Sequence, residues 1–264
     1  MLVRSAILNV MMIAAEKAGR KLIRDFGEVE QLQVSRKGPA DFVSSADNRA
    51  EKAIRQELQK ARPDFSFLME ETGIIEGEDK DRRFIVDPLD GTTNFLHGLP
   101  HWAVSIAYEE NGQVISGCVY DPIKDEMFWA EKGKGAFIND RRIRVSGRTR
   151  MADCIFATGI PFLGLDGHEK FLSQLAKIMA KSAGVRRWGA ASLDLCYVAA
   201  GRVDGFWETG LHAWDVAAGQ LIVKEAGGFV TDSQNRAFTL AAKDIVAAND
   251  KTHTNLLALL RSAK

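Results

Sequence analysis

The sequence has few cysteines, no excess charge of either sign and no long apolar run. Its three cysteines, Cys118, Cys154 and Cys196, are an odd number, are widely spaced and form no Cys-x-x-Cys pair. This pattern argues against a disulfide framework and a zinc cluster, and it fits a reducing compartment. The 35 Lys and Arg residues equal the Asp and Glu residues in number, so no overall field attracts nucleic acid or an acidic membrane.

No stretch approaches the roughly 18 apolar residues that a membrane span needs. The apolar opening of the chain superficially resembles a signal peptide, but Asn9 interrupts it and a charged helical pattern continues through Lys21 and Arg24. We therefore expect an amphipathic helix over residues 4–26 in a cytoplasmic protein that binds no membrane. With 264 residues, 46% of them hydrophobic, the chain can form one large domain or two small ones.

The pattern of expected elements changes near residue 147. Before it, two helices and a buried strand at Phe65–Met69 precede apolar strands joined by tight turns such as Asn111-Gly112, which predicts an α+β half with an antiparallel sheet. Beyond it, strands and helices alternate, which predicts an α/β half with a mostly parallel sheet. We expect one unit over residues 1–147 and a second over residues 148–264.

Residues 87–94, Asp-Pro-Leu-Asp-Gly-Thr-Thr-Asn, carry the strongest chemical signal and follow directly on an apolar run. Because Pro88 biases the preceding residue away from the helical region, Asp87 is expected to end a strand, and Asp87 and Asp90 can then face one point. Gly91 permits close backbone approach, and the amides of a helix that starts there favour an anion. The pattern predicts a hard divalent cation with a phosphate beside it.

Other acidic residues have ordinary explanations when taken singly. An exposed acidic turn is the commoner explanation for Glu70-Glu71, although these residues directly follow a predicted strand. Asp41 and Asp47 fit turn and capping roles better than catalysis. Asp215 opens a helix of small residues, which is a common structural motif. If the strands before Glu70 and Asp87 pair, however, three or four carboxylates converge.

Taken together, in this order and spacing, these segments resemble the signature motifs of the inositol monophosphatase family. The likeness covers essentially the whole chain and is greater to the bacterial branch. Its segments are Lys37-x-x-x-Asp41-x-Val43-Ser44-x-x-Asp47, Glu70-Glu71, Asp87 to Asn94, Arg186-Arg187 with residues 189–195, residues 198–205, Glu208, and Trp214-Asp215-Val-Ala-Ala-Gly219.

The resemblance implies the layered αβαβα fold of the inositol monophosphatase and fructose-1,6-bisphosphatase type. It also implies a magnesium-dependent phosphomonoesterase that forms a homodimer and is inhibited by lithium. Glu70, Asp87 and the carbonyl of Leu89 are then expected to bind one Mg²⁺. Asp87, Asp90 and Asp215 are expected to bind a second, and a more weakly held third ion shares Glu70. All are hard oxygen ligands, as Mg²⁺ prefers.

By the same resemblance, the nucleophile is a metal-activated water positioned by Glu70 and Thr92, with Asp47 hydrogen-bonded to the threonine. Backbone amides of Gly91 and Thr92 are expected to hold phosphate oxygens. The positions implied on the polyol side are Asp90, Gly189, Ala191 and Glu208, with Glu208 accepting hydrogen bonds from ring hydroxyls. The chain departs from many relatives at Met69, where they have a small residue; Met69 could crowd the metal loop, but we expect activity to survive.

The leading hypothesis is hydrolysis of inositol 1-phosphate or a similar small polyol phosphate. One alternative keeps the metal site but takes another ester, such as fructose 1,6-bisphosphate, histidinol phosphate or a 3′-phosphonucleotide. Glu208 favours a polyol, whereas a bisphosphate calls for additional cations. The other alternative is a family member that binds RNA or the transcription machinery. Balanced net charge gives that role no support, and residues 186–188, Arg-Arg-Trp, are the one basic-aromatic spot.

Overall fold

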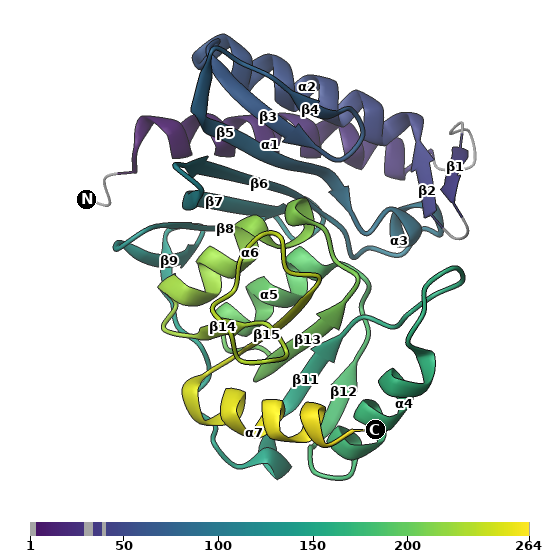
Figure 1. Cartoon of the computed structure of the whole chain (residues 1–264). Coiled ribbons are helices and arrows are strands. Elements are labelled where there is room, and N and C mark those ends of the chain that lie inside the picture. Colours follow the sequence, from purple (N-terminus) through teal and green to yellow (C-terminus); the bar gives the residue numbers. More distant parts are fainter. Residues whose placement is uncertain (1–3, 29–33, 39–40, 264) are drawn as a thin grey trace.

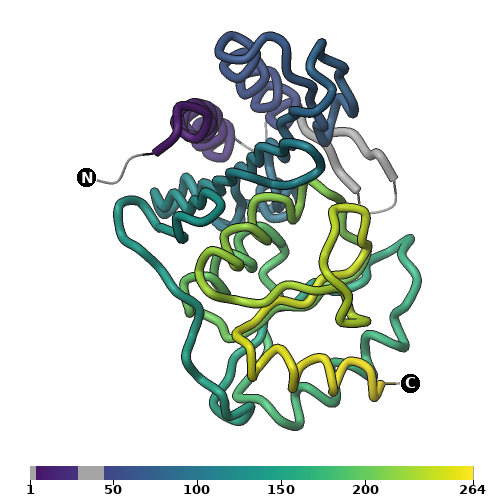
Figure 2. Tube along the Cα trace, turned by 60° about the vertical axis from the view of Figure 1, so that its left-hand side comes forward, coloured from purple at the N-terminus to yellow at the C-terminus, as the bar shows by residue number. Residues whose placement is uncertain are grey.

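The computed structural model describes residues 4–28, 34–38 and 41–263. In this part of the chain no helix is long and apolar enough to cross a membrane. Five layers alternate between helices and sheets (Figure 1), which confirms the predicted αβαβα class. Figure 2 shows the same layers from another side, with the helix at the C-terminus on the outside opposite the N-terminal helix.

The first layer consists of α1 (Ala6–Phe26) and α2 (Ser45–Ala61), which lie on one face of the larger sheet (Figure 1). The hydroxyl of Ser5 caps α1 by accepting the N–H of Leu8 at 3.1 Å. The buried side of α1 includes Leu8, Met11, Ala18 and Leu22, which recur at steps of three, seven and four and therefore share one helix face. The helix expected over residues 4–26 is confirmed.

The second layer is an eight-stranded sheet. All its pairs are antiparallel except β3 with β5. The predicted hairpin at Asn111-Gly112 is confirmed, and both residues have the positive φ that suits a tight turn. The strands in sheet order are β10 (Arg141–Ile143), β9 (Gly135–Ile138), β8 (Glu126–Glu131), β7 (Gln113–Asp121), β6 (Ala103–Glu110), β5 (Asp79–Asp90), β3 (Phe65–Met69) and β4 (Gly73–Ile75).

The middle layer consists of α5 (Ala191–Ala199) and α6 (Ala213–Glu225), which lie between the two sheets (Figure 1). All of α5 and residues 216–223 of α6 are buried, as expected for helices enclosed by protein. A Cβ added at Gly117 on β7 would lie only 2.9 Å from the Cα of Ala218, so α6 and this strand approach as closely as their backbones allow. The surrounding core takes residues from both halves of the chain, such as Val119 and Leu195.

The fourth layer is a five-stranded sheet, and α4 (His168–Met179) and α7 (Asp250–Ser262) form the fifth layer on its outer face. The strand Ile155–Thr158 pairs with a parallel neighbour on each side. The strand Asp244–Ala248 runs antiparallel to the other four, which fits the predicted mostly parallel arrangement. The strands in sheet order are β12 (Gly184–Arg186), β11 (Ile155–Thr158), β13 (Gly205–Thr209), β15 (Asp244–Ala248) and β14 (Phe229–Thr231).

Four short elements complete the described chain. They are the two-stranded pair β1 (Val34–Gly38) and β2 (Asp41–Ser44), the helix α3 (Thr92–Leu96) and the 3-10 turn η2 (Met151–Asp153). The latter leads from the first half to the second. The division at residue 147 stays a prediction.

Candidate active site

The two carboxylates of the 87–94 segment lie on a β-bulge. Asp87 was expected to end its strand, and this is wrong because β5 continues to Asp90. Between these residues β5 advances three positions while its partner advances two, from Ser105 to Ala103. The extra residue makes room for Pro88, which lacks an N–H for the ladder. It also shifts the two-residue alternation, so that Asp87 and Asp90 can face the same side.

A short network fixes the backbone after the bulge. The N–H of Leu89 donates to Oδ1 of Asp87 at 3.0 Å. The hydroxyl of Thr92 lies 3.0 Å from the carbonyl oxygen of Leu89 and 3.1 Å from Oδ1 of Asp47, and its hydrogen is shared between these two acceptors. The predicted bond between Asp47 and Thr92 is thus present, and Asp47 lies fully buried in the first turn of α2.

Glu70 reaches the same region because of the parallel pair in the sheet. Met69 at the end of β3 is aligned with Val86 on β5, and the N–H of Glu70 donates to the carbonyl of Val86 at 3.1 Å. Glu70 and Asp87 each come directly after one residue of this aligned pair, so they lie at the same level of the two neighbouring strands. The side chain of Met69 is fully buried among the residues that pack under α1 and α2.

The second half of the chain supplies partners from two helix starts. Ser192, in the first turn of α5, donates its N–H at 2.8 Å and its hydroxyl to Oδ2 of Asp90. Asp215 lies in the first turn of α6, where its Oδ2 accepts the N–H of His212 at 2.6 Å in a capping box. The start of α6 thereby holds a carboxylate towards the end of β5.

Burial and mutual repulsion disfavour ionisation of these acids. The pKa of Asp87 is raised well above its usual value by burial and then by the charges of Glu70, Asp90 and Asp215. Burial raises the pKa of Asp90 to about 6, although the bonds from Ser192 oppose this. Burial also raises the pKa of Asp215, with Asp90 and Glu70 adding to the effect. A cation would remove the repulsion that these side chains share.

The donor set fits a hard cation. In the described part of the chain, no group of three or more His, Cys, Asp or Glu side chains is already arranged to hold a metal ion. Every available donor is a carboxylate or carbonyl oxygen, and these suit Mg²⁺ rather than a soft metal. Glu70, Asp87, Leu89, Asp90 and Asp215 could hold such an ion.

A cleft of about 510 Å³ opens beside these carboxylates. Glu70 and Asp215 line it together with Glu208 and with the apolar side chains of Phe162 and Leu163, which are largely exposed. Burial raises the pKa of Glu208 to about 8, with a further rise from the charge of Asp90. The cleft thus has one acidic side next to the carboxylates and one apolar side.

The carboxylate of Glu208 lies directly over Gly159. A Cβ added at Gly159 would lie 1.8 Å from Oε1 of Glu208, a distance that no side chain could occupy. Gly159 follows β11, and Thr158 before it pairs with Trp207 before Glu208. Sequence reasoning missed Gly159, because only the parallel pairing of β11 and β13 reveals the contact.

The remaining predicted positions lie where the halves meet. Gly91 has φ 93° and precedes α3, where a Cβ would be 3.1 Å from the carbonyl oxygen of His101. The side-chain amide of Asn94 donates to that oxygen at 2.8 Å and to the carbonyl of Trp188 at 2.7 Å. This places Gly189, whose φ is 82°, beside α3.

Ala191 follows as the first residue of α5, next to the Ser192 that binds Asp90. The motif contained Asn94 but gave no sign of its bond to the second half, and the segment 189–195 contained Ser192 but gave no sign of its bond to Asp90. The side chains of Lys37, Asp41, Val43 and Ser44 lie outside the described part of the structure.

Comparisons with known proteins agree with this geometry. A profile described as "Inositol monophosphatase family" matches residues 4–264. An inositol-1-monophosphatase of Mesorhizobium japonicum is 57% identical over 98% of this chain and 97% of its own length. A protein named Nus factor SuhB of Pseudomonas aeruginosa is 44% identical over 97% of this chain and 96% of its own length.

A solved structure is also similar over the full length. The crystal structure of extragenic suppressor protein suhB from Bartonella henselae has a TM-score of 0.96 and 58% identity, and the match covers 98% of this chain and all of that one. Both the sequence profile and this structure extend across all five layers. The chain belongs to the inositol monophosphatase family.

Proposed function

We propose that this phosphatase hydrolyses inositol 1-phosphate, or a similar small polyol phosphate, in a Mg²⁺-dependent reaction. The observation that carries the proposal is the convergence of Glu70, Asp87, Asp90 and Asp215 from two strand ends and a helix start. Their shared repulsion is what bound cations relieve. The names of relatives that match nearly the whole chain support the ester class.

Five residues would hold the ions, with Asp87 between them: Glu70, Asp87, the Leu89 carbonyl, Asp90 and Asp215. Bound Mg²⁺ supplies charge neutralisation of the phosphate and lowers the pKa of water. Two or three ions fit the proposal. The same proposal includes inhibition by lithium. It also includes a homodimer, which light scattering of the purified protein would test.

The remaining groups bind and orient the substrates. The hydrogen of the Thr92 hydroxyl is directed to Asp47 and Leu89, so the lone pairs of its oxygen can accept one hydrogen bond from the attacking water. Glu70 accepts the other, and these two bonds aim the water at phosphorus. The amides of Gly91 and Thr92 hold phosphate oxygens, while Asp90, Gly189, Ala191 and Glu208 face the polyol.

A phosphate-release assay tests the proposal. Purified protein with Mg²⁺ should release phosphate from inositol 1-phosphate faster than from fructose 1,6-bisphosphate, histidinol phosphate or a 3′-phosphonucleotide. Asp90→Asn should lower kcat at least about 100-fold. Asp81→Asn, at an exposed position of the same strand, is the matched control and should retain activity. Absence of activity on inositol 1-phosphate, with strong activity on another of these esters, would overturn the substrate.

The name of the Pseudomonas aeruginosa relative favours a second role in transcription. We propose it as the alternative, in which a protein or RNA partner matters more than hydrolysis. The Asp90→Asn protein separates the two roles in cells that lack the gene. Restored growth with this variant at wild-type abundance would support the partner role, whereas failure to restore it would support hydrolysis.

A further inference from the structure

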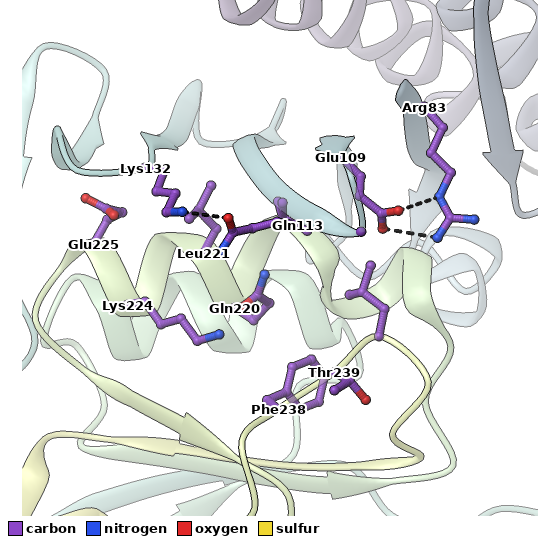
Figure 3. A pocket seen from close by; sticks show the side chains of 13 residues that line it. Arg83, Glu109, Gln113, Lys132, Gln220, Leu221, Lys224, Glu225, Phe238 and Thr239 are labelled. Atoms are coloured by element: carbon purple, nitrogen blue, oxygen red, sulfur yellow. Dashed lines mark hydrogen bonds and ion pairs between the residues drawn. The ribbon is translucent and has the colours of Figure 1, made fainter. Parts of the chain in front are cut away.

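A second cavity, of about 420 Å³, lies between the C-terminal part of α6 and the end of the β6–β7 hairpin (Figure 3). The segment with Phe238 and Thr239 closes its lower side. It shares no lining residue with the cleft beside the carboxylates. No role in the proposed reaction is assigned to it.

Two of the charged side chains that line this cavity neutralise each other. Arg83 forms a two-point ion pair with Glu109, with Nη2 to Oε2 at 3.1 Å and Nε to Oε1 at 3.0 Å. The carboxylate of Glu225 accepts the N–H groups of Gly133 and Gly135, each at 2.8 Å. Glu109 is thus paired with a cation, and both carboxylate oxygens of Glu225 already accept backbone hydrogen bonds.

Two lysines that line the cavity, Lys132 and Lys224, have no ion pair among the described residues, and of the two only Lys132 has a hydrogen bond. Lys224 lies in the last turn of α6, and Figure 3 shows its side chain extending below Gln220 towards Phe238. Within the described ranges, its ammonium has neither an ion pair nor a hydrogen bond. Burial lowers the pKa of Lys224, so the charged form is costly here. An anion beside the ammonium would offset this cost.

A buried acceptor lies one helical turn before this lysine. Gln220 is 6% exposed, and its Nε2 donates to the carbonyl oxygen of Ala217 at 3.4 Å. Its Oε1 is buried and has no hydrogen-bond partner among the described residues. Exchanging the two ends of the Gln220 amide would place its Oε1 against the carbonyl oxygen of Ala217, and two acceptors repel each other. The side-chain oxygen is therefore the atom without a partner. A buried carbonyl without a donor is uncommon, and a bound hydroxyl would satisfy it.

We propose that this cavity binds a small hydroxylated anion. Its carboxylate or phosphate pairs with the ammonium of Lys224, a hydroxyl donates to Oε1 of Gln220, and its carbon chain lies against Leu221 and Phe238. These side chains sit one helical turn apart or on the facing segment, and all line the same space. The volume suits a chain of a few carbons. The proposal is independent of the phosphatase reaction.

Amide chemical-shift titrations of the ¹⁵N-labelled protein test this site. EDTA is present, so that metal-dependent binding and hydrolysis do not contribute. The probes are glycerate, glycerol 3-phosphate and acetate, the last of which lacks a hydroxyl. Glycerate or glycerol 3-phosphate should shift the side-chain amide of Gln220 and the backbone amides of residues 220–225. Acetate should bind at least about fivefold more weakly, because it cannot donate to Gln220.

Lysine variants separate a built site from a general effect of charge. Lys224→Met should weaken binding about tenfold or more, because the anion loses a charge-assisted hydrogen bond. Lys132→Met is the matched control. Lys132 lines the same cavity, but its ammonium already donates to Oε1 of Gln113 at 2.6 Å, so its loss should change the affinity less than twofold.

Each outcome decides the proposal. Binding of glycerate alone assigns a carboxylate, binding of glycerol 3-phosphate alone assigns a phosphate, and binding of both supports the shared class. Binding of neither, shifts confined to residues 90–92 and 215, or equal effects of the two lysine substitutions would overturn it.

Discussion

Replacing Gly159 by alanine should reduce recognition of the polyol without harming the phosphate site. The new Cβ would lie 1.8 Å from Oε1 and 2.0 Å from Cδ of Glu208, whereas ordinary contacts begin at 3.4 Å. The carboxylate must therefore move by roughly 1.6 Å, which is enough to break a hydrogen bond. Above pH 8, where Glu208 is ionised despite its raised pKa, a hydrogen bond to its charged carboxylate is worth about 1.5–3 kcal/mol. The kcat/KM for inositol 1-phosphate should fall roughly 10- to 100-fold.

The assay compares two esters with Mg²⁺ present. Hydrolysis of p-nitrophenyl phosphate, which has no hydroxyls for Glu208, should change less than threefold. Gly147→Ala is the control, because its added Cβ would meet nothing within 4 Å and its φ is not positive. In a Glu208→Ala background, Gly159→Ala should have little further effect, since the group that it displaces is gone. Equal losses on both esters, or additive losses in the double variant, would refute the reasoning.

Three further perturbations have expected outcomes. Thr92→Val should lower kcat at least tenfold in a phosphate-release assay while Thr92→Ser keeps most of it, because only the hydroxyl bonds Asp47; equal activities would contradict this. Asn94→Ala should lower the free energy of unfolding by about 1–3 kcal/mol in urea titrations, because two hydrogen bonds are lost, one of them to Trp188 in the second half; an unchanged midpoint would disprove it. In EDTA, the contribution of Asp90 and Glu208 to stability should be fully present below about pH 4 and be lost as pH rises to about 8, because their folded pKa values are raised. Added Mg²⁺ should flatten the resulting fall in melting temperature, and a melting temperature of the metal-free protein that rises across this window would contradict the reasoning.

Local patterns were sufficient for most elements. The apolar spacing of α1, the turn residues of the β6–β7 hairpin and the alternation beyond residue 150 each depend on neighbours a few positions away, so they are visible in the sequence. The resemblance also predicted a hydrogen bond between Asp47 and Thr92, and the structure contains it. The ordered motifs therefore predicted the class of fold and the region of the site.

Contacts between distant segments were not visible in the same way. Pro88 indicated the end of a strand, but the continuation of β5 as a bulge depends on β6 beside it. Ser192 lay within one of the segments that carry the resemblance, but its bond to Asp90 depends on how α5 lies against the end of β5. Gly159 had no motif at all, because its constraint comes from a side chain 49 positions away that fills its space. Such features depend on tertiary packing, which single-sequence patterns do not encode.

The close packing of α6 affects how the protein can be redesigned. Gly117 admits no Cβ against Ala218, and Gly219 on the same helix would place a Cβ 2.7 Å from Leu195, so α6 is held on two sides. Larger residues at these positions would displace α6, and Asp215 would move with it. Libraries that seek new ester specificity should therefore leave this helix unchanged and vary the exposed apolar side of the cleft at Phe162 and Leu163, where added volume meets solvent.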